Sequence, residues 1–173
     1  MIVVSDTTPL ISLLKINHLA LLRDIFPKVV IPCAVYDELT SNPRFEVEAG
    51  AIRGSEFIQI REVADKQAAQ ALRTGALLDQ GESEAIVLTE EIKAELLLMD
   101  EYRGRTTARQ RGLKITGTIG VILEAFDRGL LGTEDVLLCI NGLQHNKRRI
   151  SETLLELVEK HNRSVITGFF TGK

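Results

Sequence analysis

Short runs of apolar residues alternate along this chain with longer segments in which apolar residues recur every three or four positions. The short runs are typical of buried parallel strands, and the longer segments are typical of amphipathic helices. Five runs predict strands, at residues 1–5, 29–31, 57–60, 95–99 and 113–115. Because predicted helices separate them, the pattern indicates an α/β fold with a parallel sheet covered on both faces.

The helices expected between these strands lie at about 9–25, with a break near Asn17, and at 32–39, 45–53, 65–73, 82–93, 101–110 and 118–128. Beyond Gly132 the pattern is helical only. Ser151 is suited to cap a last helix whose apolar face carries Leu154, Leu157 and Val158. We therefore expect a main domain over residues 1–130 and a C-terminal helical extension over 131–173, packed on the same unit.

Composition narrows the class of protein. The chain has 173 residues, of which 45% are hydrophobic, as in ordinary globular domains. No apolar run approaches the roughly 18 residues that a membrane span needs, and no basic segment precedes the first strand, so we expect neither a membrane anchor nor a signal peptide. Cys33 and Cys139 lie far apart and form no metal-binding pair. These features favour a cytoplasmic protein with reduced thiols.

The net charge is −3, which counts against tight non-specific binding to nucleic acid. Basic residues are nevertheless concentrated between Arg103 and Lys114, a segment without acidic residues that follows Asp100 closely. A second basic run covers residues 145–149. Each run is either a solvated surface or a site for phosphate groups.

Two acidic residues follow predicted strands directly. Asp6 ends the first strand and Asp100 ends the fourth, at the edge where open α/β sheets bind their ligands. If these strands are neighbours, the two carboxylates meet at one edge. The alternative is that each carboxylate only caps the helix that follows it.

Two further carboxylates lie on predicted helices. Glu38 borders the apolar stripe of its helix and is preferred to Asp37, which points about 100° away. Glu84 lies one turn before Leu88 and is the first choice on the next acidic helix. Glu82 is the second choice, because its place at the helix start is explained by capping and by the helix dipole. A solvated helix surface is the alternative for each.

A cluster of three or four carboxylates suits Mg²⁺ or Mn²⁺, and such a site activates water and stabilises in-line attack at phosphorus. Zinc is disfavoured because the three histidines are scattered. A nucleotide triphosphatase is disfavoured because the chain has no G-x-x-x-x-G-K-[ST] motif. A phosphoaspartyl phosphatase would need a second Asp where Thr8 stands.

These residues resemble the PIN domain, the nuclease fold of VapC-type toxins in prokaryotic toxin–antitoxin pairs. The similarity spans roughly residues 1–130 and is closest to a subgroup described as predicted nucleic-acid-binding proteins. The matching pieces are VVSDTTPLI at 3–11, PCAVYDEL at 32–39, GESEAI at 81–86, LLMD at 97–100 and ITGTIG at 115–120.

The resemblance implies a three-layer α/β/α fold with a five-stranded parallel sheet. It also implies a metal site whose acidic positions fall on Asp6, Glu38, Glu84 and Asp100, with Thr7 assisting. Many PIN domains have Asp where this chain has Glu84. The turn at 116–118 also departs from the family pattern, and its role is open.

In this picture the protein is an endoribonuclease that cleaves single-stranded RNA with Mg²⁺ or Mn²⁺ and an activated water. Arg103, Arg105 and Arg109 would contact substrate phosphates, with Arg105 the best placed. The resemblance also implies a toxin, inhibited by a small antitoxin protein, and a homodimer. The alternative is a non-catalytic module on the same fold that binds nucleic acid or protein. A receiver-like regulator is weaker, because Lys114 precedes the last strand instead of following it.

Overall fold

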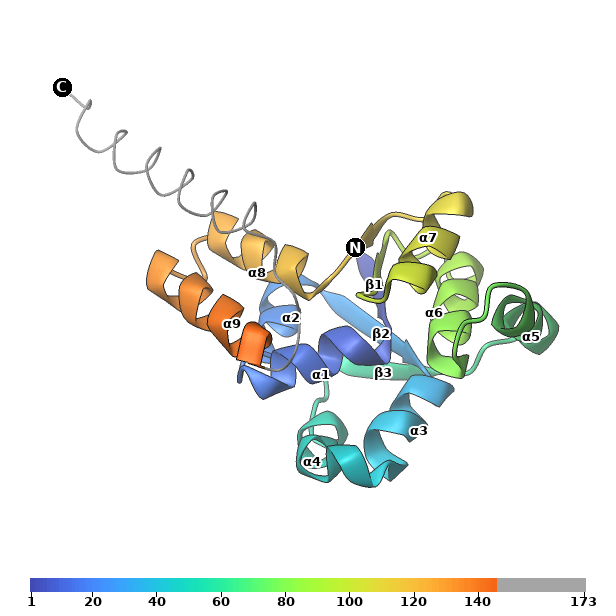
Figure 1. Ribbon diagram of the computed structural model, residues 1–173, viewed down its shortest axis with the longest axis horizontal. Coiled ribbons are helices and arrows are strands. Elements are labelled where there is room, and N and C mark those ends of the chain that lie inside the picture. Colours follow the sequence, from blue (N-terminus) through green and yellow to red (C-terminus); the bar gives the residue numbers. More distant parts are fainter. Residues whose placement is uncertain (146–173) are drawn as a thin grey trace.

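The computed structural model describes residues 1–145, which form three layers, with helices on both faces of a five-stranded parallel sheet (Figure 1). The predicted fold class is confirmed. The strands are β1 (Ile2–Ser5), β2 (Lys28–Pro32), β3 (Ile58–Arg61), β4 (Leu96–Leu98) and β5 (Ile115–Thr116), in the order β3-β2-β1-β4-β5. The first and fourth strands are therefore neighbours, as the carboxylate hypothesis required. Ser5 lies opposite Leu98 in the register of this pair.

The sheet separates two hydrophobic cores, because successive strand residues face opposite sides. Val3 and Leu98 belong to one core, whereas Val4 and Leu97 belong to the other. The first core is covered by α1 (Thr7–Lys15), α2 (Ala20–Ile25), α3 (Cys33–Ser41), α4 (Glu46–Arg53), α8 (Thr118–Asp127) and α9 (Thr133–His145), with the short 3₁₀ helix η1 (Pro43–Phe45) between α3 and α4. The second is covered by α5 (Lys66–Gly75), α6 (Gln80–Glu91) and α7 (Tyr102–Gln110).

Local backbone chemistry sets the helix boundaries near the sheet edge. The expected break between α1 and α2 is present, and Asn17 adopts a left-handed conformation there (φ 57°). α1 begins at Thr7, two residues before the expected first residue Pro9, and Asp6 takes its N-cap position. α6 also begins earlier than expected, because Asp79 and Glu82 form a reciprocal capping box at its start.

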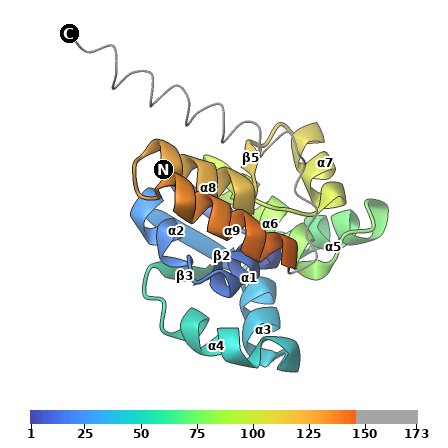
Figure 2. The ribbon, with the colours of Figure 1, turned by 60° about the vertical axis from the view of Figure 1, so that its left-hand side comes forward.

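The C-terminal part of the described chain packs on the same unit. Val136, Cys139, Ile140 and Leu143 of α9 are buried in the first core, and Figure 2 shows α9 lying alongside α8. The expected helix from Ser151 and most of the basic run at 145–149 lie outside the described residues. None of the helices within residues 1–145 is long and apolar enough to cross a membrane.

Candidate metal centre

Asp6 lies where β1 passes into α1, at the carboxyl edge of the sheet. Its backbone N–H donates to the Leu98 carbonyl oxygen at 3.0 Å, which ties this position to the end of β4. Its side chain is only 2% exposed, yet it makes no capping hydrogen bond to α1. Capping therefore does not account for a carboxylate buried at this point.

Burial raises the pKa of the Asp6 carboxyl well above its usual value. The backbone N–H of Thr7 lowers this pKa in part, while the negative charges of Asp79, Glu82 and Glu38 raise it further. Carboxyl groups from β1, α3 and the start of α6 thus repel one another at the sheet edge. A bound cation would relieve this repulsion.

The donor set at this edge fits Mg²⁺ or Mn²⁺, because carboxylate oxygens are the ligands these ions prefer. No three acidic, histidine or cysteine side chains within residues 1–145 are close enough together to enclose an ion as they stand. That spacing is compatible with Mg²⁺, which commonly keeps several waters and takes only one or two carboxylates directly. The site therefore suits a metal ion that keeps several water ligands, rather than one enclosed entirely by protein side chains.

Glu38 reaches the edge from α3 and is oriented by Thr7. The Thr7 hydroxyl donates to Glu38 Oε2 at 2.7 Å, which gives the expected assisting threonine a specific contact. Both Asp37 and Glu38 line an open groove of about 340 Å³, together with Asp79 and Gly81. Asp37 therefore reaches the same groove as Glu38, although the two side chains leave α3 about 100° apart.

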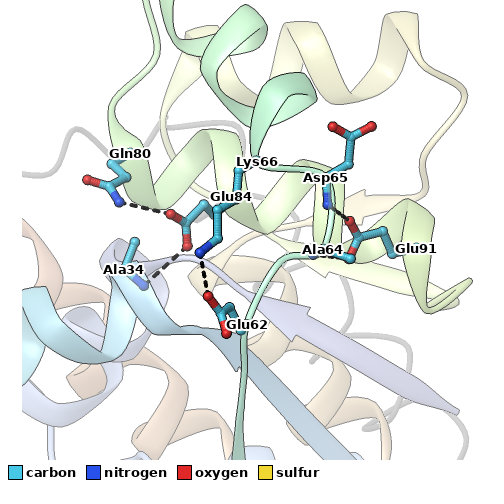
Figure 3. A network of polar contacts seen from close by, with 8 residues as sticks. All are labelled: Ala34, Glu62, Ala64, Asp65, Lys66, Gln80, Glu84 and Glu91. Atoms are coloured by element: carbon cyan, nitrogen blue, oxygen red, sulfur yellow. Dashed lines mark hydrogen bonds and ion pairs between the residues drawn. The ribbon is translucent and has the colours of Figure 1, made fainter.

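The third carboxylate on the Asp6 side is Glu82. Its side chain is buried, which raises its pKa, and its charge acts on Asp6. Glu84 lies about 200° further round the same helix. It accepts hydrogen bonds from the backbone N–H of Ala34 at 3.3 Å and from Gln80 Nε2 at 2.9 Å (Figure 3). Glu84 thus lies between α3 and α6, whereas the charge of Glu82 acts on Asp6, so Glu82 becomes an alternative to Glu84 as a metal ligand.

Asp100 is held by the first residue of α8. Its Oδ1 accepts from the Thr118 backbone N–H at 2.9 Å, and its Oδ2 accepts from the Thr118 hydroxyl at 2.6 Å. The N-cap position of α7 belongs to Glu101, so Asp100 does not cap that helix. The turn at 116–118, whose role the sequence left open, therefore fixes this carboxylate beside the end of β4.

The three arginines of α7 differ in placement. Arg105 is half-buried, and its Nη1 donates to the Met99 carbonyl oxygen at 2.7 Å. Burial and the charge of Arg109 lower the pKa of its guanidinium, and Asp100 raises it. Arg103 and Arg109 are exposed, and the charge of Arg103 lowers the pKa of Glu82. Arg103 and Arg105 thus bring positive charge to the margin of the acidic cluster.

Gly117 provides a test of the Asp100 position. A Cβ added there would lie 2.4 Å from Asp100 Oδ1 and 3.1 Å from Arg105 Nη1, although the backbone (φ −134°) suits any residue. We expect Gly117→Ala to displace this carboxylate and weaken Mn²⁺ binding about 10- to 100-fold, as for loss of a supporting contact. Titration calorimetry with Mn²⁺ measures this change. Gly50→Ala is the control, because open space surrounds that position; equal affinities of the two variants would contradict the placement.

The comparison with protein families decides the assignment. A family model described as a PIN domain matches residues 2–163. The chain belongs to the PIN-domain family. PIN domains are generally nucleases and typically use divalent metal ions. The match continues past residue 130, where the resemblance read from the motifs stopped. No curated protein matches this PIN domain.

Sequence reasoning missed two residues of the site in this PIN domain. Thr118 anchors both oxygens of Asp100, and Asp79 contributes negative charge to Asp6 besides capping α6. The D-x-x-E spacing of a capping box was visible at 79–82, and it indicated a helix start but no role at Asp6. No local pattern linked Thr118 to Asp100.

Proposed function

We propose that this PIN domain is a metal-dependent endoribonuclease that cleaves single-stranded RNA. The observation that carries the proposal is the buried Asp6 carboxylate, surrounded by the charges of Asp79, Glu82 and Glu38 at the edge of the sheet. Such a cluster costs stability unless a cation neutralises it. Buried groups with strongly shifted pKa values are also typical of functional sites.

The residues of the chain have distinct roles in this proposal. Asp6 and Glu82 hold the ion, while Asp100, fixed by Thr118, supports it from the end of β4. A divalent ion held there would lower the pKa of a water molecule and offset negative charge at the scissile phosphate. Glu38, oriented by Thr7, lines the open groove, and in this proposal it accepts a hydrogen bond from the attacking water.

Positive side chains of α7 would receive the RNA backbone. Arg103 is exposed, and its charge acts on Glu82. Arg105 is committed to the Met99 carbonyl through one nitrogen and keeps its other donors for a phosphate oxygen. Arg109 lies one turn beyond Arg105 on α7 and extends this positive edge away from the acidic cluster.

The wider biological role is also a proposal. We infer a toxin of a toxin–antitoxin pair, inhibited by a small antitoxin protein and active in the cytoplasm as a homodimer. The support is the family assignment. Size-exclusion chromatography with light scattering tests the dimer.

The proposed function is tested by incubating 5′-labelled single-stranded RNA with the wild-type protein in Mn²⁺ or in EDTA. We expect cleavage in Mn²⁺ and none in EDTA, because the carboxylates act only through the ion. Cleavage that persists in EDTA would come from a different, metal-independent nuclease. RNA that binds and stays intact in Mn²⁺ would instead support the non-catalytic binding module.

A further inference from the structure

A second cavity adjoins the acidic groove on the opposite side of the start of α6. Its volume is about 320 Å³, and it lies between the start of α3, the residues after β3, α5 and α6. Gln80 lines both this cavity and the acidic groove, so the two hollows are adjacent. The volume falls at the lower end of the range for small-ligand pockets, about 300–1,000 Å³.

One wall of this cavity is fixed by hydrogen bonds. Glu84 accepts from the Ala34 N–H and from Gln80 Nε2, which holds its carboxylate between α3 and α6 (Figure 3). Lys66 and Glu62 also line the cavity and form an ion pair, drawn in the same figure. Glu84 is therefore an oriented acceptor, since each carboxylate oxygen has two lone pairs.

The opposite wall carries polar groups without partners. Gln70 and Arg73 lie one turn apart on α5 and both line the cavity. Within residues 1–145, their side chains make no hydrogen bond or ion pair. The buried side chains of Val63 and Ala69 line the cavity as an apolar surface. An amide, a guanidinium and an apolar surface are thus available to a ligand.

We propose that this cavity is a nucleotide subsite that binds the RNA residue adjacent to the scissile phosphate; this inference rests on the proposed function. The base lies against the apolar surface and presents its Watson–Crick edge to Glu84. Arg73 and Lys66 contact the phosphate of the same nucleotide. Recognition of unpaired bases by this edge is the usual mode for single-stranded RNA.

The Glu84 carboxylate determines which base the cavity prefers. Guanine presents two adjacent donors, N1–H and the 2-amino group, which match the two oxygens of Glu84. Its O6 oxygen is an acceptor for the Gln70 side-chain amide. Adenine presents its 6-amino group beside the unprotonated ring nitrogen N1. One Glu84 oxygen then has no donor and faces the lone pair of N1, which repels it. The subsite therefore prefers guanosine.

Cys33 provides a test that needs no cleavage. Its thiol lines the cavity and is partly accessible, whereas the thiol of Cys139 is buried in the first core. We would measure the rate of Cys33 alkylation by iodoacetamide in full-length Asp6→Asn protein, in EDTA, with short RNAs that contain or lack guanosine. Fluorescence anisotropy of the same RNAs gives their affinities. We expect guanosine-containing RNA to slow the alkylation of Cys33 several-fold at saturation, and RNA without guanosine to bind more weakly.

Substitutions of Gln70 and Arg73 complete the test. Arg73→Ala and Gln70→Ala should each weaken binding of the guanosine-containing RNA about tenfold, the equivalent of one charged or polar contact of about 1.4 kcal/mol. Arg44→Ala, an exposed arginine beyond the opposite end of α3, is the matched control and should change it little.

RNA that binds without protecting Cys33, or with equal affinity for Arg73→Ala and Arg44→Ala, would overturn the subsite and leave the nuclease proposal standing. Protection of Cys33 by RNA that the wild type fails to cut in Mn²⁺ would reject the nuclease and keep the subsite. Absence of RNA binding to any form would reject both.

Discussion

Replacing Asp6 by Asn is expected to lower Mn²⁺-dependent RNA cleavage about 10³-fold while making the metal-free protein more stable. The carboxylate and the amide have nearly the same shape, so the fold at the end of β1 is kept. The loss of activity corresponds to about 4 kcal/mol, in line with the several kcal/mol that a metal ion contributes to stabilising charge in a transition state.

The gain in stability follows from the raised pKa of Asp6. A carboxyl whose pKa is higher in the folded state destabilises the fold once pH rises above its unfolded value, because the native state must then give up a proton it holds more tightly. At neutral pH an uncharged Asn removes that cost. We expect the free energy of unfolding to rise by about 1–2 kcal/mol, as for other substitutions that relieve a functional site.

Urea denaturation in EDTA measures the stability difference, and cleavage of labelled RNA in Mn²⁺ measures the activity. Asp24→Asn is the matched control, because Asp24 forms an exposed ion pair with its neighbour Arg23 and its replacement should change neither quantity much. An Asp6→Asn protein that cleaves RNA normally would remove Asp6 from the site. A less stable variant would contradict the electrostatic account of its burial.

The second large expected effect is on stabilisation by Mn²⁺, and it distinguishes Glu82 from Glu84 as the metal ligand. In wild type we expect saturating Mn²⁺ to raise stability by about 2.7 kcal/mol at 100 times its Kd. Glu82→Gln should lose most of this stabilisation, whereas Glu84→Gln should keep it. Glutamine preserves the capping box at the start of α6, since Gln serves as well as Glu at this position. The comparison therefore tests the metal contact and not the helix.

Thermal unfolding with and without Mn²⁺ gives the shift for each variant. A stabilisation of 2.7 kcal/mol corresponds to roughly 5–10 °C for a chain of this size. If Glu84→Gln lost the shift and Glu82→Gln kept it, the ion would be bound by Glu84, as the sequence predicts. Equal shifts in both variants would place the ion elsewhere on the sheet edge.

The pattern of hydrophobic residues along the chain was sufficient to predict the helices and strands of this protein. Buried parallel strands are short apolar runs and helices have a period near 3.6, so element type was readable from neighbours along the chain. Asp6 and Asp100 were found for the same reason, since each directly follows such a run. Once β1 and β4 pair, strand geometry alone brings both to one edge of the sheet.

Element boundaries were less predictable, because they depend on one or two side-chain contacts. The start of α6 moved to Gln80 through the mutual hydrogen bonds of Asp79 and Glu82. These contacts also hold the Glu82 carboxylate at the start of α6. Glu82 and Glu84 are the same residue type and only two residues apart, so composition cannot rank them.

The sequence by itself determined the three-layer fold, the order of its helices and strands, and two of the acidic residues at the sheet edge. Tertiary structure alone decided that the charge of Glu82 acts on Asp6, that Thr118 fixes Asp100, and that Glu84 lines a neighbouring cavity. The physical reason is distance along the chain. Hydrogen bonds between residues 18 or 50 positions apart form only after the sheet has placed their helices together, and no local periodicity encodes them.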